Sequence, residues 1–147
     1  MENINNQSHI MYYFLGLKGL SSRIIVKDIS IDHFVPWSYV AHDEMWNLNP
    51  TTKSINSSKS NNLPDWNTYF KRLAMLEYQS YRMMREYDVV HKEFEKCAKK
   101  HFNDDRLRYR IYESDIEYER FEKELEAVIL PVYKSAQNCG FVEWRYI

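Results

Sequence analysis

The chain has 147 residues, of which 44% are hydrophobic and 28% charged, a size that fits one domain or a small catalytic unit with a helical extension. Its formal net charge of −1 excludes a uniformly basic nucleic-acid binder, although binding depends on where Lys and Arg lie rather than on their sum. It contains no apolar run long enough to cross a membrane. The two cysteines form no C-x-x-C pair, which indicates a reduced, cytoplasmic protein with buried thiols.

The first predicted element is a strand near the start of the chain. Residues 1–9 are polar, whereas residues 23–31 are rich in β-branched side chains, and their second half alternates apolar with polar residues. This strand runs directly into Asp32 and His33, and Pro36 then stops it. Residues 37–46 are expected to form a loop or a short helical turn.

A polar stretch and then a helical pattern follow. Residues 49–62 are so rich in Asn, Ser and Thr that by themselves they would be interpreted as a linker. Asp65 is a good N-cap candidate, and the apolar residues after it recur at helical spacing to about His101. With only three Gly and four Pro in the chain, long helices are favoured over a turn-dense β fold.

The last third is predicted to be helical with one break. After residues 103–105, a second helix is expected over 106–130, with an apolar stripe and a strongly acidic remainder. Pro131 is expected to end it, a short helix over 132–138 to follow, and Gly140 to cap that helix. The tail, residues 141–147, is expected to be a final strand or a packed end.

Four residues form the pattern that carries chemistry: Asp32, His33, Asn47 and Asn56. Histidine suits the removal of a proton from water at neutral pH, provided that a hydrogen bond fixes its tautomer. A hard divalent cation prefers oxygen ligands and keeps several waters, so one carboxylate and one amide can suffice. Because a regular strand points successive side chains to opposite faces, we expect a bulge or a strand end at Asp32 and His33.

The segment SIDHFVPWSYVAHDEMWNLNPTTKSINSSKSNNLP resembles the core of an HNH endonuclease in its H-N-N variant. Its D-H…N…N-x-x-K-S-x-x-L-P arrangement is similar to the HNH domain of CRISPR effector nucleases and to phage resolvase-type HNH enzymes. The resemblance implies an α+β protein: a ββα-metal core over residues 10–64, followed by a helical extension over residues 65–147 packed on that core.

The resemblance also implies a role for each matching residue. His33 is expected to be the general base, and Asp32 and Asn56 to bind one Mg²⁺ or Mn²⁺. Asn47 is expected to orient the histidine, and Lys59 to contact phosphate or order the site. The expected substrate is nucleic acid, more specifically DNA.

One departure from the family concerns a structural zinc. Many relatives hold a zinc with two C-x-x-C pairs, and the corresponding places here are Tyr12 and Leu15, then Thr52 and Ile55. Both pairs are absent together, so no structural zinc is expected. An apolar cluster of Tyr12, Leu15 and Ile55 is predicted to replace it.

Other interpretations stay open at this point. The chain could be a catalytically inactive HNH scaffold that binds nucleic acid or a protein, for example in a phage-defence or restriction system. The helical region could also bind a partner protein or a second copy. Trp37, Trp46 and Trp66 could stack on bases or pack in the core. Basic side chains that could contact phosphate are Lys53, Lys59, Lys99, Lys100, Arg106, Arg108 and Arg110.

Overall fold

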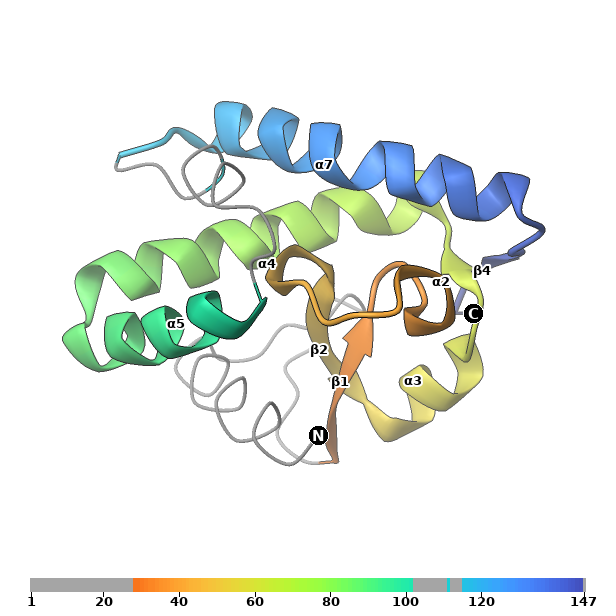
Figure 1. The fold of residues 1–147 in the computed structure, drawn as a ribbon, viewed down its shortest axis with the longest axis horizontal. Coiled ribbons are helices and arrows are strands. Elements are labelled where there is room, and N and C mark those ends of the chain that lie inside the picture. Colours follow the sequence, from red (N-terminus) through yellow and green to blue (C-terminus); the bar gives the residue numbers. More distant parts are fainter. Residues whose placement is uncertain (1–27, 102–110, 112–114, 147) are drawn as a thin grey trace.

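The computed structural model describes residues 28–101, 111 and 115–146. Its elements are β1 (Ile29–His33), α2 (Trp37–Val40), the 3-10 turn η1 (Met45–Asn47), β2 (Leu48–Thr52), α3 (Lys53–Lys59), β3 (Leu63–Pro64), α4 (Trp66–Glu86), α5 (Asp88–His101), α7 (Tyr118–Asn138) and β4 (Glu143–Trp144). A hairpin and a short helix are therefore followed by a helical region (Figure 1). The predicted α+β class, with a small ββα core before a mainly helical part, is confirmed.

The hairpin pairs β1 with β2 in antiparallel register. Asp32 lies opposite Asn49 and His33 opposite Leu48. β1 ends at His33, which agrees with the expectation of a strand end at these two residues. Residues 49–62, whose composition by itself is typical of a linker, contain most of β2 and all of α3. Helix α3 begins there because Thr52 caps it, its side chain accepting a hydrogen bond from the Ile55 backbone N–H at 3.2 Å.

Three helix predictions were wrong in their boundaries. The helix expected over 106–130 is not helical at residues 115–117, and α7 begins at Tyr118. The helix expected to run to about His101 is divided at Tyr87, which has extended backbone angles and separates α4 from α5. Pro131 was expected to end a helix, but α7 continues through it to Asn138. Pro131 is exposed while Leu125, Ile129 and Tyr133 are buried, so packing of the apolar face offsets the backbone hydrogen bond that proline cannot make.

Both helix caps agree with the sequence. Asp65 caps α4, its carboxylate accepting from the Thr68 backbone N–H at 2.9 Å. Gly140 follows α7 with a φ of 95°, and the next residue, Phe141, donates its N–H to the Ala136 carbonyl at 3.1 Å. This pattern is the one that terminates helices at a glycine.

The expectation of buried thiols was wrong for Cys139, which is exposed.

One hydrophobic core is shared by the hairpin region and the helices. Phe34, just after β1, packs against Trp66 of α4 and Tyr133 of α7, with ring centroids 6.2 and 6.4 Å apart. Trp66 in turn stacks on Phe70 at 4.3 Å. Trp46 is buried in the same core. Trp46 and Trp66 are therefore packing residues, whereas Trp37 is 50% exposed.

The end of the chain returns to the hairpin region. β3 and β4 pair in parallel, with Leu63 opposite Glu143 and Pro64 opposite Trp144. Tyr133 of α7 donates to the Pro64 carbonyl at 2.9 Å. The C-terminal segment therefore lies beside the residues that immediately follow α3 (Figure 1). None of the described helices is long and apolar enough to cross a membrane.

Candidate functional site

Asp32 and His33 diverge from the end of β1. Asp32 is 6% exposed and its carboxylate meets the Lys59 ammonium of α3, with Nζ 3.2 Å from each carboxylate oxygen. His33 is partly exposed and its Nε2 lies 2.6 Å from the Asp43 carboxylate. The alternation of a strand therefore separates the two side chains, one towards α3 and the other towards the loop before η1.

Asp43 was missed in the sequence, and its contact constrains the histidine. An ionised carboxylate only accepts hydrogen bonds, so the proton of this bond belongs to His33 Nε2. In the neutral imidazole this leaves Nδ1 as the unprotonated nitrogen, the one able to accept a proton. Asp43 lies ten residues after His33 in a loop. Neither helical nor strand periodicity relates residues that are joined by a loop, so the sequence pattern did not indicate this contact.

Asn47 fixes the two residues that follow the histidine. Its side-chain oxygen accepts from the Val35 N–H at 2.7 Å and its side-chain nitrogen donates to the Val35 carbonyl at 2.8 Å. Its own carbonyl accepts from the Phe34 N–H at 2.7 Å. Asn47 is completely buried, so these bonds form without competition from water. It acts on the backbone after His33, while the side-chain contact to the ring comes from Asp43.

Lys59 is an almost fully buried cation. It is 1% exposed, and its ammonium donates to the His33 carbonyl at 2.7 Å as well as meeting Asp32. Burial lowers the pKa of Lys59 and raises the pKa of Asp32, and in each case the charge of the partner opposes the shift. The ammonium therefore connects α3 to both residues at the end of β1.

Asn56 lies on α3 and faces the same strand. Its side-chain nitrogen donates to the Ser30 hydroxyl at 2.8 Å. This hydrogen bond involves the nitrogen of the Asn56 amide and does not involve its oxygen. The oxygen is the atom that a hard cation prefers as a ligand. Asn49 of β2 is completely buried nearby, with its amide nitrogen 3.3 Å from the Asp32 carbonyl, and its side-chain oxygen has no hydrogen-bond partner.

The donor types here, one carboxylate and one amide, are ones that a hard divalent cation prefers. The contacts of Lys59 to Asp32 are both 3.2 Å, longer than its 2.7 Å bond to the His33 carbonyl and longer than a close charge-assisted bond. The ammonium is therefore held more closely by the His33 carbonyl than by the Asp32 carboxylate. Among the described residues, no group of three or more His, Cys, Asp and Glu side chains could hold a metal ion, so a carboxylate and amide site would depend on water and phosphate for its other ligands.

Two of the four positions that hold zinc ligands in many relatives, Thr52 and Ile55, lie within the described residues. Thr52 serves as the α3 cap and Ile55 supplies the N–H that it accepts. Tyr12 and Leu15 lie outside the described residues, so the predicted apolar cluster is not described. Residues 106–110 of the predicted basic group also lie outside them, as do the side chains of Lys99 and Lys100.

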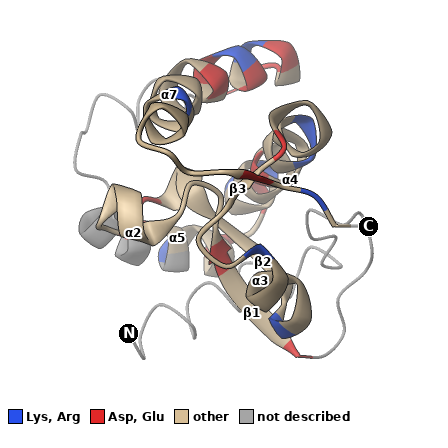
Figure 2. Cartoon of the chain, turned by 90° about the vertical axis from the view of Figure 1, so that its right-hand side faces the viewer, with Lys and Arg blue, Asp and Glu red and all other residues tan. Residues whose placement is uncertain are grey.

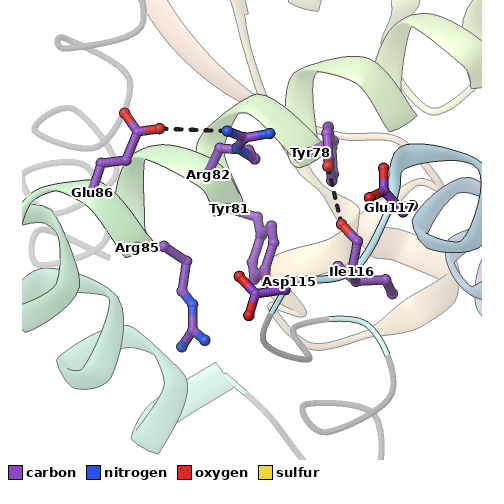
Figure 3. Close-up of a pocket in the computed structure, with 8 residues that line it drawn as sticks. All are labelled: Tyr78, Tyr81, Arg82, Arg85, Glu86, Asp115, Ile116 and Glu117. Atoms are coloured by element: carbon purple, nitrogen blue, oxygen red, sulfur yellow. Dashed lines mark hydrogen bonds and ion pairs between the residues drawn. The ribbon is translucent and has the colours of Figure 1, made fainter.

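A separate cavity lies in the helical region, far along α4 from the hairpin. It measures about 290 Å³ and lies between α4 and residues 115–117 (Figure 3). Its lining contains both acidic and basic side chains, and Arg82 lies 3.7 Å from Glu86. Tyr78, in the same lining, donates a hydrogen bond to the Ile116 carbonyl at 3.0 Å. It has none of the predicted site residues in its lining.

The hairpin geometry agrees with a comparison against protein families. Residues 18–65 match the model of the HNH endonuclease family. The resemblance of this segment to HNH endonucleases is confirmed. The match ends at the N-cap of α4, so it contains β1, β2 and α3 and excludes the helical region. No curated protein and no solved structure gives a significant match.

Proposed function

We propose that the chain is a metal-dependent endonuclease that hydrolyses phosphodiester bonds in DNA, with His33 as the general base. The observation that carries this proposal is the pair of contacts around the histidine. Asp43 engages Nε2 and leaves Nδ1 for the proton of a water molecule, and Asn47 fixes the backbone just beyond the ring through Val35. An imidazole ring whose one nitrogen is hydrogen-bonded and whose neighbouring backbone is fixed is well oriented for proton transfer at its other nitrogen.

Asp32 and Asn56 would hold the divalent cation, Mg²⁺ or Mn²⁺. When bound there, such a cation would stabilise negative charge on the phosphate and on the leaving oxygen. The Lys59 ammonium opposes the rise that burial causes in the pKa of Asp32, and it connects α3 to the His33 carbonyl. The two residues proposed as metal ligands belong to β1 and α3, which the Lys59 ammonium connects.

Each protein group has a defined task in this proposal. His33 Nδ1 accepts a proton from the attacking water, and Nε2 keeps its own proton on the Asp43 carboxylate. The positive charge that develops on the imidazole is then stabilised by Asp43, as a carboxylate does for a catalytic histidine in other hydrolases. Asp43 is a positioning residue, because its contact is with the base and not with the substrate.

The test is plasmid nicking in the presence of Mg²⁺ or Mn²⁺. His33→Ala is expected to lower the nicking rate by about 10²–10⁴-fold, the usual contribution of a general base, while Mn²⁺ affinity measured by calorimetry is retained. Asn56→Ala is expected to weaken Mn²⁺ binding. The matched control is His91→Ala, which removes an exposed histidine on α5 and should leave both quantities unchanged.

Two outcomes would contradict the proposal. Nicking that survives His33→Ala at the wild-type rate would remove His33 from the mechanism. A wild-type protein that binds nucleic acid but neither binds Mn²⁺ nor cuts would favour the non-catalytic scaffold. Asp43→Asn sharpens the assignment: it should lower kcat with little change in KM, because Asp43 does not touch the substrate.

A further inference from the structure

Exposed aromatic side chains lie on both sides of α3. Trp37 of α2 is 50% exposed, and Tyr146, beyond β4, is 49% exposed. An exposed aromatic ring offers a flat face on which an unpaired base can stack. α2, α3 and β4 lie at the same end of the molecule (Figure 1), and Figure 2 looks onto that end.

Two hydrogen bonds connect these flanks to the α3 region. On one side, the Ser38 hydroxyl of α2 donates to the Asn61 side-chain oxygen at 3.3 Å. On the other, the Trp144 indole N–H donates to the Ser58 hydroxyl at 3.0 Å. Trp144 also stands between two rings, with centroids 5.5 Å from Tyr69 and 6.1 Å from Tyr146. We call this surface, made of α2, residues 53–61 and residues 142–146, the α3 face.

The outer side chains of the α3 face suit a phosphate backbone. The exposed residues of α3 and the turn after it are Lys53, Ser54, Ser57, Ser58, Ser60 and Asn61, which offer hydroxyl, amide and ammonium donors without bulk. Arg145 projects from the same face, its side chain 66% exposed although it pairs with Asp65 at 3.0 Å. Donors of these kinds account for most contacts to nucleic-acid phosphates.

Acidic groups on this face are few and engaged. Glu143, the acidic residue of this face, accepts from Gln137 at 2.9 Å. Next to the face, Asp65 accepts from Arg145, and Asp32 is buried against Lys59. The acidic residues of α7 lie along a different element, at the top of Figure 2. The chain thus has a net charge of −1, while the exposed side chains of the α3 face include Lys53, Arg145 and several hydroxyl and amide groups.

We propose that the α3 face binds a nucleic-acid strand with unpaired bases, with Trp37 and Tyr146 stacking on bases and Arg145 contacting phosphate. This inference rests on the proposed nuclease function and adds the form of its substrate. Aromatic faces stack on any base without sequence preference, but only on bases that do not already stack within a duplex. Strands of this kind occur at single-stranded regions, flaps and junctions.

The experiment measures binding of labelled oligonucleotides in EDTA, so that cleavage plays no part. Unpaired DNA and RNA strands are compared with a duplex of the same sequence. Trp37→Ala and Tyr146→Ala are each expected to weaken binding of the unpaired strand by about tenfold, in the range known for base stacking, and to change duplex binding much less. Tyr87→Ala is the matched control, because Tyr87 is 52% exposed but lies between α4 and α5.

Arg145 is tested by the salt dependence of binding. Arg145→Gln should reduce the slope of log affinity against log salt by about one charge. Arg82→Gln, which removes an equally exposed arginine paired with Glu86 on α4, should leave the slope unchanged. The difference between DNA and RNA arms shows which backbone the face accepts.

The outcomes separate this inference from the proposed function. Equal effects of Trp37→Ala, Tyr146→Ala and Tyr87→Ala, or tighter binding of duplex than of unpaired strand, would overturn the α3 face as a strand-binding surface while leaving His33-dependent nicking intact. Loss of nicking in His33→Ala together with these results would retain the nuclease and remove only the substrate form. A wild-type protein that neither binds nor nicks any substrate would overturn both.

Discussion

The hairpin region, β1 to α3, and the helical region, α4 to α7, bury different kinds of side chain. The hairpin region buries polar groups that bind one another, including the Asp32 and Lys59 pair and Asn47, whose side chain makes two backbone hydrogen bonds. The helical region buries mainly aromatic and aliphatic groups, such as Phe70, Leu73 and Phe121. Because buried polar groups cost free energy unless they are paired, their concentration beside β1 indicates a role other than packing.

Glu77 extends this comparison to the helical region. It lies on α4, is 2% exposed, and its Oε1 has no hydrogen-bond partner. Burial raises the pKa of Glu77 well above its ordinary value. At Asp32 a neighbouring cation thus opposes the effect of burial on the pKa, whereas burial is the cause that acts on the pKa of Glu77.

The largest expected effect comes from breaking the buried ion pair. Lys59→Met should lower the free energy of unfolding by about 3–5 kcal/mol, because it leaves the Asp32 carboxylate buried without its cation. Lys53→Met, at an exposed position of the same helix, should change it by less than about 0.5 kcal/mol. Urea unfolding measures both. The double variant Asp32→Asn with Lys59→Met should recover part of the loss, and no recovery would mean that the loss does not come from the unpaired Asp32 carboxylate.

A smaller effect of opposite sign is expected at Glu77. Its folded pKa is raised, so its contribution to stability is most favourable below the ordinary value of 4.5 and declines as the pH rises towards the folded pKa. Glu77→Gln should therefore stabilise the protein by about 1–2 kcal/mol at pH 7, and this gain should disappear near pH 4.

Thermal unfolding across pH 4–8 tests the Glu77 prediction. Glu86→Gln is the control, since Glu86 is exposed on the same helix and pairs with Arg82. A Glu77→Gln variant that is less stable than wild type at pH 7 would show that the carboxyl has a partner or a role that its burial conceals.

The smallest effect is expected where the two regions join. Asp65 caps α4, and hydrogen bonds from the Thr68 hydroxyl, then from Arg145 and the Thr68 backbone N–H, lower its pKa below 3.8. Its contribution is therefore full above about pH 4 and is lost as the pH falls through the lowered folded pKa. Asp65→Ala should cost about 1 kcal/mol at pH 7, as the loss of a helix cap does.

Asp65→Asn separates the cap from the charge. Asparagine can still accept the Thr68 N–H, so this variant should cost less than Asp65→Ala at pH 7. Its difference from wild type should shrink as the pH is lowered below 4, as measured by thermal unfolding. A difference that does not depend on pH would show that the charge of Asp65 contributes nothing.

The sequence by itself determined the features that depend on neighbouring residues. The strand ending at Asp32 and His33, the Asp65 cap and the Gly140 terminus follow from local patterns, and the motif spacing was enough to identify the HNH segment. Local propensity and capping act over a few residues, so a linear reading can detect them.

The tertiary structure decided what depends on residues far apart in the chain. It brings Asp43 to His33, buries Lys59 against Asp32, and returns Trp144 to Ser58 across 86 residues. It also divides the helix at Tyr87 and carries α7 through Pro131, where the sequence alone predicted the opposite. These outcomes depend on which surfaces are buried together, and burial of an apolar face outweighs the local preference of one residue.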